Sequence, residues 1–169
     1  MAEQATWSEW LRENGSRLML YARQQTRCEA DAEDVLQNAL VKTWKSHGDK
    51  PREELLGLIY TNIRRCAVDL ARSHDRRQQR EQTVVADEGP PVAWFELPED
   101  DETRALQVAL SALPEKFREV ITLKLWGDLT FAQIGETLEI SQNTAASRYR
   151  YGLEALRSQL ATEAESLRK

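Results

Sequence analysis

The residues best suited to recognise another molecule lie on a helix that the sequence predicts from Ser141 to about Leu160. Its outward positions carry amides, small residues and arginines, namely Gln142, Asn143, Ala146, Ser147, Arg148, Arg150 and Tyr151. Arg binds guanine and Asn or Gln binds adenine through paired hydrogen bonds. A short predicted helix from Thr130 to about Leu138 precedes it at helix-turn-helix spacing. The pattern predicts a DNA-reading helix, with a helical hairpin that has a solvated outer face as the alternative.

A second candidate surface follows a predicted helix that runs from Pro51 to about Arg80. Asn62, Arg65, Arg72 and Arg76 recur about once per turn on its polar side. Hydrogen-bond donors at that spacing can follow a phosphate backbone. The alternative is a solvated face whose Arg stems cover apolar surface.

A third candidate surface lies on a helix predicted to start near Asp31. Its apolar stripe recurs in steps of three and four residues and consists of Ala32, Val35, Leu36, Ala39, Leu40 and Thr43. The opposite face carries Asp34, Gln37, Asn38 and Val41. An exposed valine among amides and a carboxylate suits docking of a partner, although an ordinary solvent-facing side remains the alternative.

The sequence gives little support for catalysis. Its only histidines are His47 and His74, and it has no nucleophile elbow, P-loop, zinc-protease motif or glycine-rich phosphate loop. Cys28 and Cys66 lack a CxxC pattern or a neighbouring histidine cluster. We therefore expect no catalytic residue, no metal site and no cofactor, so that the protein is not an enzyme.

The elements that must position these surfaces are helices. The chain has 169 residues, of which 41% are hydrophobic and 30% charged, with seven Gly and five Pro, which fits two small helical domains and excludes collagen-like, disulfide-scaffold and wholly disordered classes. A net charge of −5 argues against a protein that coats nucleic acid. No membrane-spanning segment or secretory signal is found, so we expect a cytoplasmic protein without membrane association.

An acidic segment divides the helical chain into two parts. From Thr83 to Thr103 it has no Lys or Arg, four Gly or Pro breakers, and the carboxylates Asp87, Glu88, Glu96, Glu99, Asp100, Asp101 and Glu102. Trp94 and Phe95 are adjacent aromatics that should dock on another surface. We predict an all-α fold with helical domains at 1–80 and 104–169, joined by an acidic flexible linker at 81–103.

Local signals place the remaining helix ends. A Thr6–Glu9 capping box predicts a first helix to about Gln25, with a break or bend near Asn14 and Gly15. Pro51 suits the first turn of the third helix, after a polar loop at 46–50. In the C-terminal part, Pro114 should end one helix, and Phe117, Val120, Ile121 and Leu125 should face inward on the next. Thr130 and Gln133 form a second capping box, flanked by a Leu129–Ile134 staple.

Two of these segments resemble a known family. Residues 31–44, DAEDVLQNALVKTW, are similar to region 2.2 of the extracytoplasmic-function (ECF) sigma factors of bacterial RNA polymerase. Residues 110–120, LSALPEKFREV, followed by 129–160, resemble region 4 of the same family. Both segments occur in the family's order and on either side of a linker.

The resemblance implies a role for each surface. Asp34, Gln37, Asn38 and Val41 would dock on the clamp helices of the β′ subunit of core RNA polymerase, and the β subunit would be a further partner. The −10 element of promoter DNA would be contacted by His47, Asp49, Lys50, Asn62, Arg65, Arg72 and Arg76. The −35 element would be read by Asn143, Ser147, Arg148, Arg150 and Tyr151. The protein would act as a monomer and be held by an anti-sigma factor.

Five positions depart from the family pattern: Asn38, Leu58, Arg65, Glu139 and Ala146. Two other functions remain open at this point. A helix-turn-helix regulator would bind a palindromic operator as a dimer without polymerase. A degenerate sigma-like protein would instead titrate polymerase or an anti-sigma factor.

Overall fold

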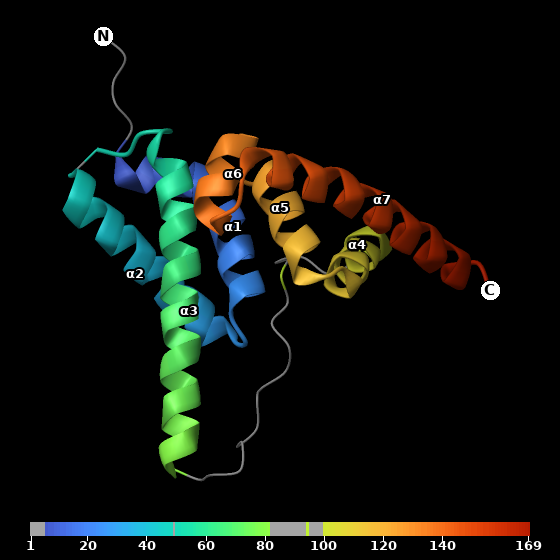
Figure 1. The fold of residues 1–169 in the computed structure, drawn as a ribbon, viewed down its shortest axis with the longest axis horizontal. Coiled ribbons are helices and arrows are strands. Elements are labelled where there is room, and N and C mark those ends of the chain that lie inside the picture. Colours follow the sequence, from blue (N-terminus) through green and yellow to red (C-terminus); the bar gives the residue numbers. More distant parts are fainter. Residues whose placement is uncertain (1–5, 49, 82–93, 95–99) are drawn as a thin grey trace. The chain divides into compact units, whose positions relative to one another are not determined.

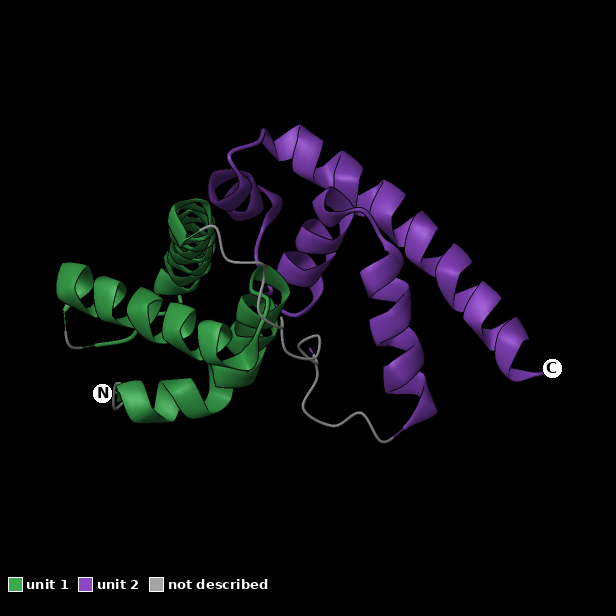
Figure 2. Ribbon diagram, turned by 90° about the horizontal axis from the view of Figure 1, so that it is seen from below, with its two compact units in different colours: residues 1–92 green, residues 93–169 purple. Residues whose placement is uncertain are grey.

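The computed structural model describes residues 6–48, 50–81, 94 and 100–169, and within these the chain forms seven α-helices and no β-strand (Figure 1). The helices belong to two compact units, residues 1–92 and 93–169 (Figure 2). The predicted all-α fold with two small helical domains is confirmed. Residues 82–93 and 95–99 of the predicted linker, as well as Asp49, lie outside the described residues.

The first unit consists of α1 (Trp7–Gln25), α2 (Glu29–His47) and α3 (Leu55–Glu81), and α3 packs against both other helices (Figure 1). The predicted capping box starts α1: the Glu9 amide donates to Thr6 Oγ1 at 3.3 Å, and the Glu9 carboxylate accepts from the Thr6 amide at 2.9 Å. Hydrogen bonds from the amide and then the hydroxyl of Thr6 lower the pKa of the Glu9 carboxyl. Local sequence thus fixes where the chain enters this unit.

The core of the first unit is formed where α1 and α3 cross. Tyr21 and Tyr60 are fully buried and meet edge to face, with ring centroids 5.4 Å apart. Burial raises the pKa of the Tyr60 phenol, so its hydroxyl stays neutral. Ile59 and Ile63 complete this buried side of α3 and leave the opposite side to solvent.

α1 is continuous through Asn14 and Gly15, so the break or bend predicted near these residues is not a break in the helix. Asn14 is buried, and its Nδ2 donates to the Trp10 carbonyl at 2.8 Å. Glycine in a helix interior costs only about 1 kcal/mol. The burial of Trp10 and Leu18 on either side of Gly15 outweighs that cost.

The predicted connection between α2 and α3 is also partly wrong. α2 includes Ser46, whose hydroxyl donates to the Lys42 carbonyl at 2.9 Å, and it ends at Gly48 with φ 82°. Pro51 is not in the first turn of α3, which begins at Leu55. The buried pair Leu55 and Leu56 starts the helix, since from these residues onward side chains reach the core.

The second unit contains α4 (Asp101–Ala112), α5 (Glu115–Leu125), α6 (Phe131–Leu138) and α7 (Gln142–Leu167), and α7 packs against the other three (Figure 1). Asp100 caps α4, and donation from the Thr103 amide, then from its hydroxyl, lowers the pKa of the Asp100 carboxyl. Pro114 separates α4 from α5 as predicted. Leu125, by contrast, is 51% exposed, and Leu123 is buried in its place.

The helix-turn-helix connection has the predicted caps. Thr130 and Gln133 form a capping box at α6, and the flanking Leu129 and Ile134 are both buried. Ser141 Oγ accepts from the Thr144 amide at 3.0 Å and so caps α7. α7 extends beyond the predicted Leu160 to Leu167.

The turn between α6 and α7 depends on two backbone features. Gly135 allows close approach, because a Cβ at this position would lie 2.7 Å from the Ile140 carbonyl oxygen. Glu139 ends α6 in the left-handed conformation, with φ 58° and ψ 42°. That conformation costs a non-glycine residue roughly 1–2 kcal/mol.

Glu139→Gly should therefore raise the thermal midpoint of the second unit by a few degrees, because glycine adopts this conformation without a Cβ penalty. Calorimetry or circular dichroism of the full chain measures the shift. Glu136→Gly is the matched control: the residue is exposed inside α6, where glycine should cost about 1 kcal/mol. Destabilisation by both substitutions would contradict this interpretation of the turn.

Candidate nucleic-acid and partner interfaces

The outer face of α2 is exposed along its length. Asp34, Gln37, Asn38 and Val41 are all exposed, whereas Ala32, Val35, Leu36 and Ala39 are buried on the opposite side. The face is acidic and amidic toward the start of α2 and apolar toward its end. It can therefore offer hydrogen bonds and apolar contact to one partner.

Trp44 extends this face and was missed as a candidate binding residue. It lies one turn beyond Val41, and the two side chains are 48% and 41% exposed. The signal was present in the sequence, because position 44 continues the spacing of 34, 37 and 41. We define Asp34, Gln37, Asn38, Val41 and Trp44 as the α2 face.

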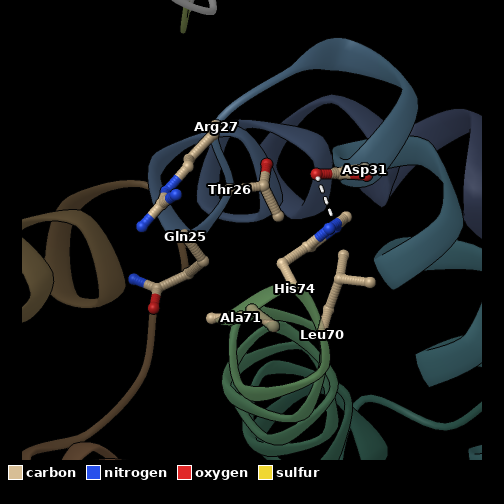
Figure 3. A pocket seen from close by; sticks show the side chains of 8 residues that line it. Gln25, Thr26, Arg27, Asp31, Leu70, Ala71 and His74 are labelled. Atoms are coloured by element: carbon tan, nitrogen blue, oxygen red, sulfur yellow. Dashed lines mark ion pairs between the residues drawn. The ribbon is translucent and has the colours of Figure 1, made fainter. Parts of the chain in front are cut away.

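The start of α2 is held to both neighbouring helices. The Arg23 guanidinium pairs with Glu29 at 2.8 Å, and this hydrogen bond holds the pKa of the Glu29 carboxyl below its usual value. In a small pocket between the end of α1, the start of α2 and α3, His74 Nε2 lies 3.6 Å from Asp31 Oδ2 (Figure 3). These contacts add to the helix packing that orients α2 within the first unit.

Asn62 connects α3 with α2. Its Nδ2 donates to Thr43 Oγ1 at 3.0 Å, and the Thr43 hydroxyl in turn donates to the Ala39 carbonyl at 2.9 Å. Thr43 is fully buried and Asn62 half-buried. One amide hydrogen of Asn62 is thus engaged inside the protein, while its Oδ1 is a separate acceptor.

The remaining predicted −10 residues are exposed where the structure describes them. Arg65, Arg72 and Arg76 lie on α3, whose residues 71–81 are all exposed. His47 is the last residue of α2, and Lys50 lies in the connection before α3. At 1.5 Å per residue, Arg76 is about 30 Å along the helix from Leu55. The structure therefore arranges these residues as an extended track and does not gather them into one pocket.

The first turns of α7 carry the candidate −35 residues. Asn143 and Arg150 are exposed and Ser147 is half-buried, and their spacing places them on one side of the helix. Arg148 is half-buried and lies about 140° around the helix from Asn143. The Arg150 guanidinium lies 5.0 Å from the centroid of the exposed Tyr151 ring. Asn143, Ser147 and Arg150 form the candidate reading face, and Arg148 lies outside it, toward the packed side of α7.

A set of ring contacts holds α7 against α5 and α6. The rings of Phe131 and Tyr149 lie 5.5 Å apart, and Lys124 Nζ lies 4.7 Å from the Phe131 centroid. Lys124 also donates to the Leu129 carbonyl at 3.1 Å. Through these contacts α6 is joined to both α5 and α7.

Within the described part of the chain, no group of three or more His, Cys, Asp or Glu side chains could hold a metal ion. No described helix has the length and apolar character needed to cross a membrane.

Comparisons with known proteins agree with both halves of the chain. The model of Sigma-70 region 2 matches residues 10–77, and that of Sigma-70, region 4 matches residues 109–158. The first match covers the α2 face, and the second covers the helix-turn-helix. A regulator that acts without polymerase is not favoured, because the N-terminal half matches a sigma-factor region.

Individual relatives are ECF RNA polymerase sigma factors. SigW of Bacillus subtilis is 31% identical over 144 residues, covering 77% of this chain and 75% of SigW. SigK of Mycobacterium tuberculosis is 28% identical over 162 residues, covering 92% of this chain and 86% of SigK. SigE of Mycolicibacterium smegmatis is 26% identical, and the match covers 63% of its length.

A solved structure shares the fold. The sigma factor RpoE, in complex with the anti-sigma factor NepR from Bartonella quintana, superposes with a TM-score of 0.68 at 20% identity, covering 92% of this chain and 96% of RpoE. Sigma factors are non-enzymatic regulators that bind core RNA polymerase and promoter DNA. Since both regions match in order and the identity to SigW extends over most of both chains, this chain belongs to the ECF sigma factors of the sigma-70 family, alternative sigma factors that direct promoter recognition and transcription initiation.

Proposed function

We propose that the two units of this sigma factor bind different parts of the transcription machinery. Residues 1–80 bind core polymerase and the −10 element, residues 104–169 bind the −35 element, and residues 81–103 link them. The observation that carries this proposal is the presence of an exposed candidate surface within each matched region: the α2 face in region 2 and the first turns of α7 in region 4.

Core polymerase docks on the α2 face, with Asp34, Gln37, Asn38 and Val41 against the clamp helices of the β′ subunit. Exposed Val41 and Trp44 supply the apolar centre that a stable interface needs. The second unit contacts the β subunit. Docking makes each DNA contact intramolecular, which raises the effective concentration of two surfaces that bind DNA weakly.

The −10 strand follows the track from the connection before α3 along that helix. One base of the −10 strand is turned out of the duplex and is bound by exposed His47 and Lys50, together with Asp49 between them in the sequence. Arg65, Arg72 and Arg76 contact the phosphates of the strand. Asn62 contributes its Oδ1 acceptor, since one of its two amide hydrogens is donated to Thr43.

One chain binds one promoter, because a promoter has two different elements and the protein has two different DNA-binding surfaces. We propose that the chain is a monomer, acts in the cytoplasm and is not an enzyme. An anti-sigma factor holds it in its inactive state, as suggested by the fold shared with RpoE, which was solved with one.

Run-off transcription with core polymerase over a promoter library tests this function. Addition of the chain should yield transcripts from a subset of promoters that share a −10 and a −35 sequence. Core binding without transcripts would support the degenerate titrating protein instead. Absence of both core binding and transcripts would contradict the proposal.

Arg150→Ala and Arg148→Ala should each weaken promoter recognition by about 1–3 kcal/mol, roughly 5- to 150-fold in transcription at low holoenzyme concentration. Arg150 lies with Asn143 and Ser147, so its loss should relax preference at one −35 position. Arg148 lies outside that face, where its long side chain can reach a phosphate but not a base edge, so its loss should weaken all promoters alike. Transcription from promoters that differ only in the −35 element measures both effects. Transcription like that of the wild type at every −35 sequence would favour a solvated helix face.

A further inference from the structure

Trp94 is the described residue between α3 and Asp100, and it packs on the second unit. Its indole is half-buried against the cluster of Ala109, Leu110, Leu113, Ile121 and Leu156. The Arg118 guanidinium of α5 lies over the ring, 5.1 Å from its centroid. A cation over an indole face is attracted by the ring quadrupole, and the apolar cluster excludes water from the ring's buried side.

We propose that Trp94 is an anchor that fixes the linker to the second unit and so leaves only residues 82–93 to connect the two units. Chain geometry sets the consequence. The thirteen peptide steps from Glu81 to Trp94 span at most about 45 Å, whereas the twenty steps from Glu81 to Asp101 could span about 70 Å. The anchor removes about a third of the linker's reach.

This inference rests on the proposed function, and it makes Trp94 a positioning residue for promoter spacing. Each base pair between the −10 and −35 elements adds about 3.4 Å along the DNA. A shorter tether narrows the range of separations over which both units can bind together. Loss of the anchor should therefore broaden the tolerated spacing without altering the preferred −35 sequence.

Limited digestion of the full chain with a Glu-specific protease tests the anchor directly. Glu88 and Glu96 lie on opposite sides of Trp94 in the sequence. Cleavage after Glu96 should be at least about 5-fold slower than after Glu88, because docking restrains the residues next to Trp94. Trp94→Ala should remove that difference by accelerating cleavage after Glu96 alone, and Arg118→Ala should reduce it.

Two controls separate anchoring from general loosening of the second unit. Trp94→Phe keeps an aromatic ring and should retain most of the protection. Leu129→Ala removes a buried side chain of the second unit outside this cluster and should leave the ratio of the two cleavage rates unchanged. Equal rates in the wild type, an unchanged ratio in Trp94→Ala, or an equal effect of Leu129→Ala would overturn the anchor.

Run-off transcription by the holoenzyme then tests the consequence, on promoters whose spacer is changed by up to three base pairs. Lengthening the optimal spacer by two base pairs should lower wild-type transcription about 10-fold and that of Trp94→Ala no more than about 3-fold. Superimposable spacer profiles would overturn the positioning role. A wild-type chain that fails to initiate would instead refute the proposed function, and the protease ratio would still decide the anchor. Arg118→Ala provides the same comparison if Trp94→Ala does not fold.

Discussion

Replacing Asp34 with Arg and Gln37 with Ala together should reduce binding of core RNA polymerase by at least about 100-fold without unfolding the first unit. Both residues are exposed on the α2 face, opposite the buried stripe, so the fold does not depend on them. The arginine reverses a charge at the docking surface, and like charges brought together at an interface cost several kcal/mol. Pull-down or surface-plasmon titration with core polymerase measures the loss.

Glu13→Arg with Gln78→Ala is the matched control, because it makes the same chemical changes at exposed sites of the same unit outside the α2 face. It should bind core polymerase like the wild type. Helical circular dichroism confirms that both double variants are folded. A folded Asp34→Arg/Gln37→Ala variant that binds core polymerase at wild-type strength would place the docking site elsewhere.

The isolated chain should bind its promoter at least about 100-fold more weakly than the holoenzyme does at physiological salt. Its net charge of −5 opposes association with DNA, and affinity for DNA comes mainly from neutralised phosphates. The described surfaces offer a few arginines each, too few to overcome that repulsion separately. When both surfaces are held on core polymerase, binding of one makes binding of the other intramolecular. The overall affinity for the promoter then rises by about 10²–10⁴-fold.

Fluorescence anisotropy with a labelled promoter decides this point, titrated with the chain alone and with the chain plus core polymerase. A scrambled promoter is the control for sequence-specific binding. Tight, specific binding by the free chain, with two chains per DNA, would contradict polymerase-dependent recognition and would support a dimeric regulator.

Several features could be predicted from short stretches of sequence because their causes are local. The capping boxes at Thr6 and Thr130 and the cap at Ser141 involve residues three apart, so residue type and spacing are enough to place them. The buried stripe of α2 follows from helical periodicity, which in turn exposes Asp34, Gln37 and Val41 on the other side. The order of the two sigma-factor regions likewise follows from sequence motifs.

Other features depended on contacts between distant residues. The glycine cost at Gly15 favoured a break, yet the burial of Trp10 and Leu18 keeps α1 intact. On α5, the inward positions include Leu123 and exclude Leu125, because packing against α7 decides which side is buried.

Propensity and periodicity act over one or two turns, so the helical class, the caps and the residue types on each candidate surface follow from the amino-acid sequence alone. Packing between helices sets which side chains meet. It engages Asn62 with Thr43, nineteen residues away. It also docks Trp94 beneath Arg118. These pairings arise only when helices pack, because their energies depend on distances between atoms that sequence separation does not specify.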